Sequence, residues 1–278
     1  MIVNYTNLKR QSRIWKSFTG VTVQEFAELE LKGEPLWLEQ EFNRLNRPDR
    51  QRAMGGGQQK TLPFREQLLM TLIWLRLYLA LDALGYLFGV DKSTVSRYTK
   101  SVLPILRQIG EATLGWSEPP KRGQGKSLDK VLSEKPDLFA YIDATEQRIR
   151  RSSDKEQQKA DYSGKKGQHT RKTQFTVNED GIVRHLSLSS PGSKHDRKHF
   201  SVSGVAAKIP TDVTVGGDAG YQGIHHDLPE HNVITPFKKS KHHPLTAEEK
   251  LLNREFSSGR IVVENTICQF KHFRILAD

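Results

Sequence analysis

The chain has almost no cysteine, since Cys268 is the only one among its 278 residues. A single cysteine cannot form an intramolecular disulfide, and it excludes a zinc site built from several thiolates. Long apolar runs are also missing, because the longest candidate, residues 68–81, is interrupted by Arg76. A membrane-spanning helix needs about 20 consecutive apolar residues, so we expect no membrane partner. Scarce cysteine also fits a reducing cytoplasm, where we expect the protein to reside.

Acidic residues are the scarcer charge, with 32 Asp and Glu against 43 Lys and Arg, a net charge of +11. The basic residues are spread over the whole chain, which favours a polyanionic partner, above all double-stranded DNA. A hydrophobic content of 36% is enough for packed cores, so we expect a folded protein and not a disordered chain.

The composition changes along the chain predict four segments. Thr22 and Glu25 form a capping box at the start of a helix, and Gly55-Gly56-Gly57 indicates a hinge. A stretch rich in Gly, Pro, Lys and Ser then indicates a linker. The expected segments are an N-terminal helical segment over 1–57, a helix-turn-helix DNA-binding domain over 58–106, a linker over 107–136 and an α/β catalytic domain over 137–278.

The helix-turn-helix prediction depends on three short helices. Apolar residues recur at helical spacing from Leu68 to Leu79, a second helix covers 81–88, and Gly89-Val90 makes the turn. Asp91 can cap a third helix, in which Val95, Tyr98 and Val102 face inward. The outward side chains suit phosphates and base edges of a major groove, although an ordinary solvated helix face has the same composition. These candidate DNA-binding residues are Lys92, Ser93, Thr94, Ser96, Arg97 and Lys100.

After residue 137 the pattern changes to strands. We expect strands over 138–143, continuing as far as 149, then 172–177 and 182–187 around the turn Asn178-Glu179-Asp180-Gly181, then 213–217 and 233–236. A helix is expected after Gly192. The last helical region begins at Thr246, where Glu249 completes a capping box, and a break is expected near 257–259.

Three acidic residues are the candidate catalytic and metal-binding groups: Asp143 and Asp218 end apolar strands, and Glu264 lies in the last helix. Neighbouring strand ends meet at one edge of a sheet, so a helix packed there can add Glu264. Carboxylates are the ligands that Mg²⁺ prefers, and such a set can hold two Mg²⁺ ions, with Mn²⁺ as a substitute.

Arg260 and Lys271 share one helical face with Glu264, at spacings of four and seven residues. Two cations beside an acid can bind DNA phosphate, while the alternative is a pair of weak surface ion pairs. Lys165 and Lys166 lie in a glycine-containing basic loop that either contacts the DNA backbone or is merely solvated.

Two further acids need separate interpretation. Glu146 lies three residues after Asp143, so odd spacing on a strand places it on the opposite face and predicts no catalytic role. Asp196 is either an accessory acid of the site or the cap of the following helix, and the cap is the commoner case.

At this point the sequence resembles a known family. The matching pieces are Phe88-Gly89-Val90 with Ser93-Thr94-Val95-Ser96-Arg97, Ile142-Asp143-Ala144-Thr145-Glu146, Tyr162-Ser163-Gly164-Lys165-Lys166 with His169-Thr170, Pro191-Gly192-Ser193 with His195-Asp196, Gly217-Asp218-Ala219-Gly220-Tyr221-Gln222-Gly223, Thr235-Pro236-Phe237, and Arg260 with Glu264 and Lys271. In this order they resemble bacterial insertion-sequence transposases of the DDE superfamily, in the insertion-sequence-five group related to the Harbinger elements.

The resemblance implies an RNase H-like catalytic domain that cuts DNA at element ends and joins the freed 3′-OH to target DNA. It implies that Asp143, Asp218 and Glu264 bind the metal ions, that Arg260 and Lys271 contact DNA near the cut, and that the N-terminal helices bind terminal inverted repeats. A homodimer is expected because two element ends must be joined, and the nucleoid of a bacterial cytoplasm is the expected location.

The chain departs from the family pattern at two places. Ser257 stands where relatives often have a tyrosine, and the sequence ends seven residues after Lys271, where relatives usually continue. Two interpretations stay open, a C-terminally truncated catalytic domain and one piece of a frameshifted pair. The alternative functions are an impaired transposase that occupies inverted repeats as a repressor, and a helix-turn-helix regulator with a ligand-sensing domain.

Overall fold

The computed structural model describes residues 2–46, 60–116, 138–239 and 244–276, which form two compact units. A helical unit comprises Met1–Thr113 with Lys271–Ala277, and an α/β unit comprises Leu114–Phe270. The expected hinge at 55–57 lies outside the described residues. No helix in the described ranges is both long enough and apolar enough to cross a membrane.

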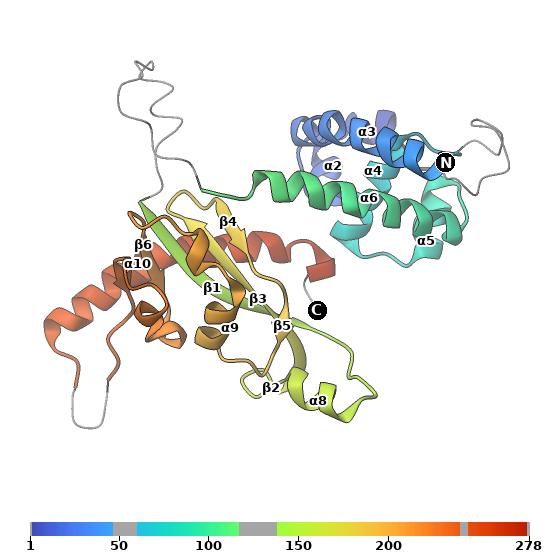
Figure 1. Ribbon diagram of the computed structural model, residues 1–278. Coiled ribbons are helices and arrows are strands. Elements are labelled where there is room, and N and C mark those ends of the chain that lie inside the picture. Colours follow the sequence, from blue (N-terminus) through green and yellow to red (C-terminus); the bar gives the residue numbers. More distant parts are fainter. Residues whose placement is uncertain (1, 47–59, 117–137, 240–243, 277–278) are drawn as a thin grey trace, which may run out of the picture. The chain divides into compact units, whose positions relative to one another are not determined.

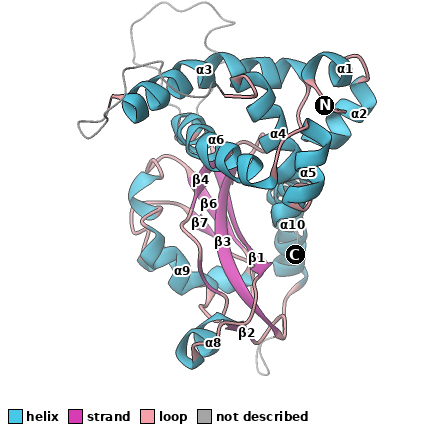
Figure 2. Ribbon diagram, turned by 90° about the vertical axis from the view of Figure 1, so that its right-hand side faces the viewer, coloured by secondary structure: helices cyan, strands magenta, loops and turns pink. Residues whose placement is uncertain are grey.

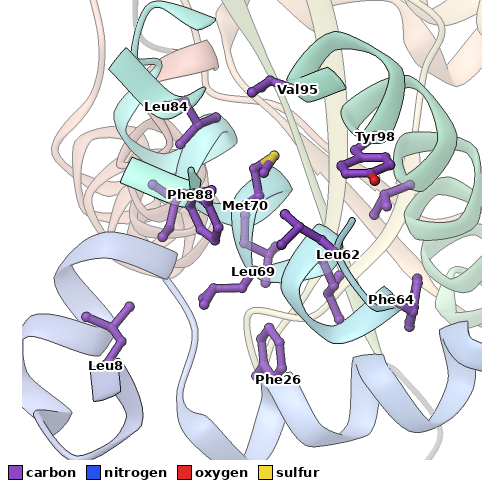
Figure 3. Close-up of a cluster of buried hydrophobic side chains, with 14 of the residues drawn as sticks. Leu8, Phe26, Leu62, Phe64, Leu69, Met70, Leu84, Phe88, Val95 and Tyr98 are labelled. Carbon is purple, nitrogen blue, oxygen red and sulfur yellow. The ribbon is translucent and has the colours of Figure 1, made fainter. Parts of the chain in front are cut away.

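The helical unit packs around a single apolar core (Figure 3). Leu69, Met70 and Ile73 are fully buried at its centre, and Phe26 and Phe88 pack there from other helices. The capping box at Thr22 forms as expected, since Thr22 and Glu25 exchange both hydrogen bonds. The elements of this unit are α1 (Tyr5–Lys9), α2 (Ser12–Thr19), α3 (Val23–Leu45), α4 (Phe64–Leu77), α5 (Leu81–Phe88), α6 (Lys92–Thr113) and the short helix η4 (Arg274–Leu276).

The helix-turn-helix is present as the sequence predicts, with α5 and α6 joined by a tight turn. Gly89 ends α5 in the left-handed conformation, φ 66°, which glycine adopts without strain. The Asp91 carboxylate accepts a hydrogen bond of 2.8 Å from the Ser93 amide and so caps α6. Val95 and Tyr98 face the core, which leaves the polar side of the same helix outward.

The expected linker begins later than the sequence indicates. Helix α6 continues to Thr113 because Ile105 and Ile109 are buried on the face that begins with Val102, so core packing extends the helix. Pro104 lies within α6 and does not end it. The remainder of the expected linker, from residue 117 onward, lies outside the described residues.

The α/β unit has one curled, mixed sheet with helices on both of its faces (Figures 1 and 2). Its strands are β1 (Phe139–Arg148), β2 (Tyr162–Ser163), β3 (Gln168–Asn178), β4 (Val183–Leu186), β5 (Ser190–Pro191), β6 (Thr214–Gly217) and β7 (Val233–Ile234). Its helices are α8 (Lys155–Asp161), α9 (Asp196–Ser203), α10 (Ala247–Lys271) and the short helices η1 (Ala206–Lys208), η2 (Ala219–Tyr221) and η3 (Ile224–His226).

Strand β1 lies at the centre of the sheet. It pairs antiparallel with β3 on one side and parallel with β6 on the other, and β7 extends the parallel part. The hairpin between β3 and β4 turns at Gly181, as the sequence predicts. Helices α9 and α10 lie on opposite faces of this sheet (Figure 2). This arrangement is consistent with an RNase H-like fold and confirms the expected fold class.

Each face of the sheet has its own core. On the α9 face Ile142 of β1 packs with Phe200 and Tyr221, all fully buried. On the α10 face Phe175 of β3 packs with Val263. Because side chains alternate along β1, neighbouring residues of this strand serve different faces.

The expected break near 257–259 does not occur, and α10 is continuous from Ala247 to Lys271. Gly259 lies against the sheet, where a Cβ atom would run into the Tyr141 hydroxyl. The glycine therefore allows close packing of the helix on β1 and does not end it. Ser257 also remains helical, and its hydroxyl donates to the Asn253 carbonyl one turn earlier.

Candidate active site

The pairing of two parallel strands brings Asp143 and Asp218 to the same level of the sheet. Ile142 of β1 lies opposite Gly217 of β6, so Asp143, within β1, lies beside Asp218, the residue that follows β6. Asp218 caps the short helix η2, where its Oδ1 accepts a hydrogen bond of 2.8 Å from the Gly220 amide. The register therefore places the two carboxylates on neighbouring strands. Only Asp218 follows the end of its strand, because β1 continues in its pairing with β3 to Arg148 and Asp143 lies within it, not at its end as expected.

Helix α10 brings Arg260 and Glu264 to the same place. The Arg260 Nη2 atom lies 3.2 Å from Glu264 Oε1 and 3.9 Å from Asp143 Oδ2. The arginine side chain is largely buried, whereas that of Glu264 is 57% exposed. Arg260 thus links the two acids directly, in addition to the phosphate contact that the sequence suggested for it.

The electrostatics of this cluster favour a bound cation. The pKa of Asp143 is raised to about 6, chiefly by burial. The Ala144 amide and Arg260 oppose this rise, and the charges of Asp218 and Glu264 contribute to it. The guanidinium group of Arg260 therefore does not offset the cost of a charged Asp143. A divalent cation beside these oxygens would supply the missing positive charge.

The donor chemistry fits Mg²⁺ or Mn²⁺, because carboxylate oxygens are hard ligands. In the described part of the chain, however, no group of three or more His, Cys, Asp or Glu side chains is arranged to hold one ion. Glu264 is turned toward Arg260, and its exposed side chain has room for another rotamer. Asp143 and Asp218 are the pair that the backbone itself places together.

The other predicted site residues lie elsewhere. Lys165 and Lys166 are exposed in the turn between β2 and β3, which closes at Gly167 with φ 64°. Lys271 is exposed at the end of α10 and groups with the helical unit, so its role beside Glu264 depends on spacing alone. The helix-turn-helix candidates also belong to the helical unit, where Lys92, Ser93, Arg97 and Lys100 are exposed and Thr94 and Ser96 are half-buried.

A second charged cluster lies on the α9 face. Lys172 of β3 is nearly buried, and its Nζ lies 2.8 Å from Asp196 Oδ1, 2.8 Å from the Lys194 carbonyl and 3.9 Å from Glu146 Oε1. Glu146 is therefore on the face predicted for it and also accepts a hydrogen bond from the Thr170 hydroxyl. Cross-strand pairing explains the cluster, since Glu146 and Lys172 are direct partners in register.

Asp196 does not cap α9, so the commoner of its two interpretations is wrong. His195 holds the cap position, without a side-chain hydrogen bond, and Asp196 is the first residue of the helix. Its carboxylate instead turns to Lys172 and to the Asp218 turn. The charge-assisted contact with Lys172 takes the place of a local bond to the helix end.

Two groups near the site escape detection in the sequence, Lys172 and Tyr221. Tyr221 is fully buried, and its hydroxyl has no hydrogen-bond partner among the described residues. Burial raises its pKa well above the ordinary value, and the charges of Asp196, Asp143 and Asp218 add to this. The only signal for Lys172 is a lysine within a strand, opposite an acid of the partner strand.

Comparison with known proteins agrees with this geometry. Residues 142–278 match the family described as DDE superfamily endonuclease, and residues 60–112 match the helix-turn-helix of DDE superfamily endonuclease. The chain is 33% identical over 232 residues to a probable transposase for insertion sequence element IS702 from Microchaete diplosiphon, which covers 83% of this chain and 78% of that protein. The chain therefore belongs to the DDE superfamily of transposase endonucleases and has the helix-turn-helix domain of that family.

Proposed function

We propose that this protein is a metal-dependent DNA transposase that binds terminal inverted repeats, hydrolyses phosphodiester bonds at the element ends and transfers the freed 3′-OH to target DNA. The observation that supports this most directly is the position of Asp143 and Asp218 side by side on neighbouring parallel strands, with Arg260 between Asp143 and Glu264. Such a cluster has no evident structural purpose, because burial raises the pKa of Asp143 instead of stabilising its charge.

In this proposal Asp143, Asp218 and Glu264 hold two Mg²⁺ ions, which Mn²⁺ can replace. When bound, such ions lower the pKa of the attacking hydroxyl and stabilise charge on the leaving oxygen. Arg260 contacts both Glu264 and Asp143, and its guanidinium group would be available to a phosphate when the ions satisfy these carboxylates. A guanidinium group suits both tasks, since carboxylate and phosphate present similar pairs of oxygens.

DNA recognition is assigned to the outward face of α6 and to basic groups of the α/β unit. Lys92, Ser93 and Arg97 are exposed in the first turns of α6, the part of a recognition helix that contacts base edges. Arg97 donates to the Thr94 hydroxyl at 2.8 Å, which orients its guanidinium along this face. Lys165, Lys166, Arg260 and Lys271 complete the proposed set as phosphate contacts.

The test is cleavage of a labelled duplex that carries the element's terminal repeat, with Mg²⁺ or Mn²⁺. Asp218→Asn should abolish cutting, because it removes a carboxylate at the strand end. Asp212→Asn is the matched control, since it makes the same change at an exposed position just before the same strand. Equal cutting by both variants would refute the assignment of Asp218.

The same experiment separates the repressor hypothesis from the enzyme. Binding of the repeat without any metal-dependent cutting by the unmodified chain would support an impaired transposase that occupies DNA. A homodimer is part of the proposal because two ends must be joined, and light scattering of the complex with repeat DNA tests it. Action on chromosomal DNA places the protein at the nucleoid of a bacterial cytoplasm.

A further inference from the structure

Asp196 occupies a position that a helix cap or a surface ion pair does not explain. Its Oδ1 is held at 2.8 Å by Lys172, whose side chain is only 8% exposed. Its Oδ2 points the other way, toward the turn that follows Asp218. A buried lysine requires a partner, but only one oxygen of Asp196 is needed for this purpose.

Gly220 shows how close Asp196 and Asp218 are. A Cβ atom at position 220 would lie 2.9 Å from Asp196 Oδ2 and 3.0 Å from Asp218 Oδ1, so the two carboxylates flank this one residue. Neighbouring carboxylates repel each other, and their approach needs a compensating group. Glycine at 220 leaves the space between them free of any side chain.

Tyr221 gives a second observation, independent of the Asp196 contacts, that points to this cluster. Its side chain is fully buried, its hydroxyl has no partner in the described ranges, and the charges of Asp196, Asp143 and Asp218 all act on it. An unpaired buried hydroxyl costs free energy, which phenylalanine would avoid. The tyrosine packs directly on the end of β6, because a Cβ atom added at Gly217 would lie 2.7 Å from Tyr221 Cβ.

We propose that Asp196 is a positioning residue of the active site, held by Lys172, and that it acts with the Tyr221 hydroxyl to fix the Asp218 turn for binding a divalent cation. This rests on the proposed function, since the cation is the one assigned to Asp143 and Asp218. The site then has a fourth carboxylate on the α9 face, opposite the contribution of α10. The buried Tyr221 hydroxyl, on which the charges of these carboxylates act, would be the hydrogen-bond donor available to them when the cation is bound.

The first measurement is Mn²⁺ binding to the full chain without DNA, monitored through the electron paramagnetic resonance signal of free Mn²⁺. The second measurement is thermal unfolding in EDTA. Asp196→Asn should weaken Mn²⁺ binding about tenfold, the lower end of the effect of removing an outer partner of a metal ligand. Asp212→Asn is the control for loss of one negative charge in the same unit. Asp143→Asn identifies the cation site itself.

Tyr221→Phe separates positioning from stability. It should weaken Mn²⁺ binding while leaving the unfolding midpoint in EDTA unchanged or higher, because the lost hydroxyl has no partner in the described structure. A purely structural tyrosine would give a lower midpoint and unchanged Mn²⁺ affinity, which would overturn its role. If Asp196→Asn fails to fold, Tyr221→Phe still tests whether this cluster positions the cation site.

The outcomes distinguish the two proposals. Equal Mn²⁺ affinity for Asp196→Asn and Asp212→Asn, with binding lost in Asp143→Asn, overturns this inference and leaves the proposed function intact. If the unmodified chain binds no Mn²⁺ even at high concentrations of the ion, this inference and the proposed metal-dependent function are both overturned.

Discussion

Replacing Asp143 by asparagine should stabilise the metal-free protein at neutral pH while it removes a proposed metal ligand. The pKa of Asp143 is raised from 3.8 to about 6 in the folded state, chiefly by burial. Between these values the folded state binds a proton that the unfolded state has released, so the contribution of Asp143 to stability falls as pH rises. Above pH 6 the charged Asp143 destabilises the folded state by its full amount, and below pH 4 this destabilisation is absent.

The size of the effect follows from the shift. Two pKa units correspond to about 3 kcal/mol, and partial exposure of the side chain makes this an upper value. The value already includes the favourable charge of Arg260 and the unfavourable charges of Asp218 and Glu264. Asparagine keeps the shape of the side chain and removes the charge, so Asp143→Asn should gain about 1–3 kcal/mol at pH 7.5.

Hydrogen exchange of the slow amides in β1 and β3 measures this in EDTA, because these amides report opening of the α/β unit alone. Comparing the two proteins at each pH cancels the intrinsic pH dependence of exchange. The difference should rise from near zero at pH 4 to a plateau above pH 6. A difference independent of pH would refute the reasoning, as would an equal gain in stability for both proteins on adding Mn²⁺.

Three further outcomes follow from other parts of the molecule. Arg97→Ala should weaken repeat binding and lower the salt slope by about one, whereas Arg107→Ala on the same helix should leave both unchanged in a filter-binding titration. Burial lowers the pKa of His199, whose ring lies between two serine hydroxyls, so the contribution of this ring to stability should be lost as pH falls below about 6.5, and calorimetry should find this loss absent in His199→Gln. Gly259→Ala should lower the unfolding midpoint by several degrees and reduce cleavage, because its methyl group displaces α10 from Tyr141; an unchanged midpoint would contradict this.

The helical elements could be predicted well because their signals are local. Capping at Thr22 and Asp91 and the left-handed Gly89 depend on side chains within three residues, and each forms as expected. The two failures have tertiary causes. Burial of Ile109 extends α6 into the expected linker, and packing of Gly259 on β1 keeps α10 whole.

The site could be predicted only in part. The apolar runs before Asp143 and Asp218 indicate these two acids, and the register of β1 with β6 places them side by side. The expected common strand end is not found, because pairing with β3 extends β1 to Arg148. The bridge from Arg260 to Asp143 could not be derived, since it depends on the depth at which α10 packs. The neighbourhood of Lys172 and Tyr221 depends on which residues face each other across the sheet, and this is fixed by register and not by spacing along the chain.

The contact between Gly259 and Tyr141 has a consequence for how this sequence can change over time. Glu264 lies little more than one turn after Gly259 on α10, so the depth of the helix at residue 259 sets how far the glutamate reaches over the sheet. A larger residue at 259 can be accommodated only if the side chain at 141 loses its hydroxyl or shrinks further. We therefore expect positions 141 and 259 to vary together among related transposases, with a glycine retained wherever the tyrosine is retained.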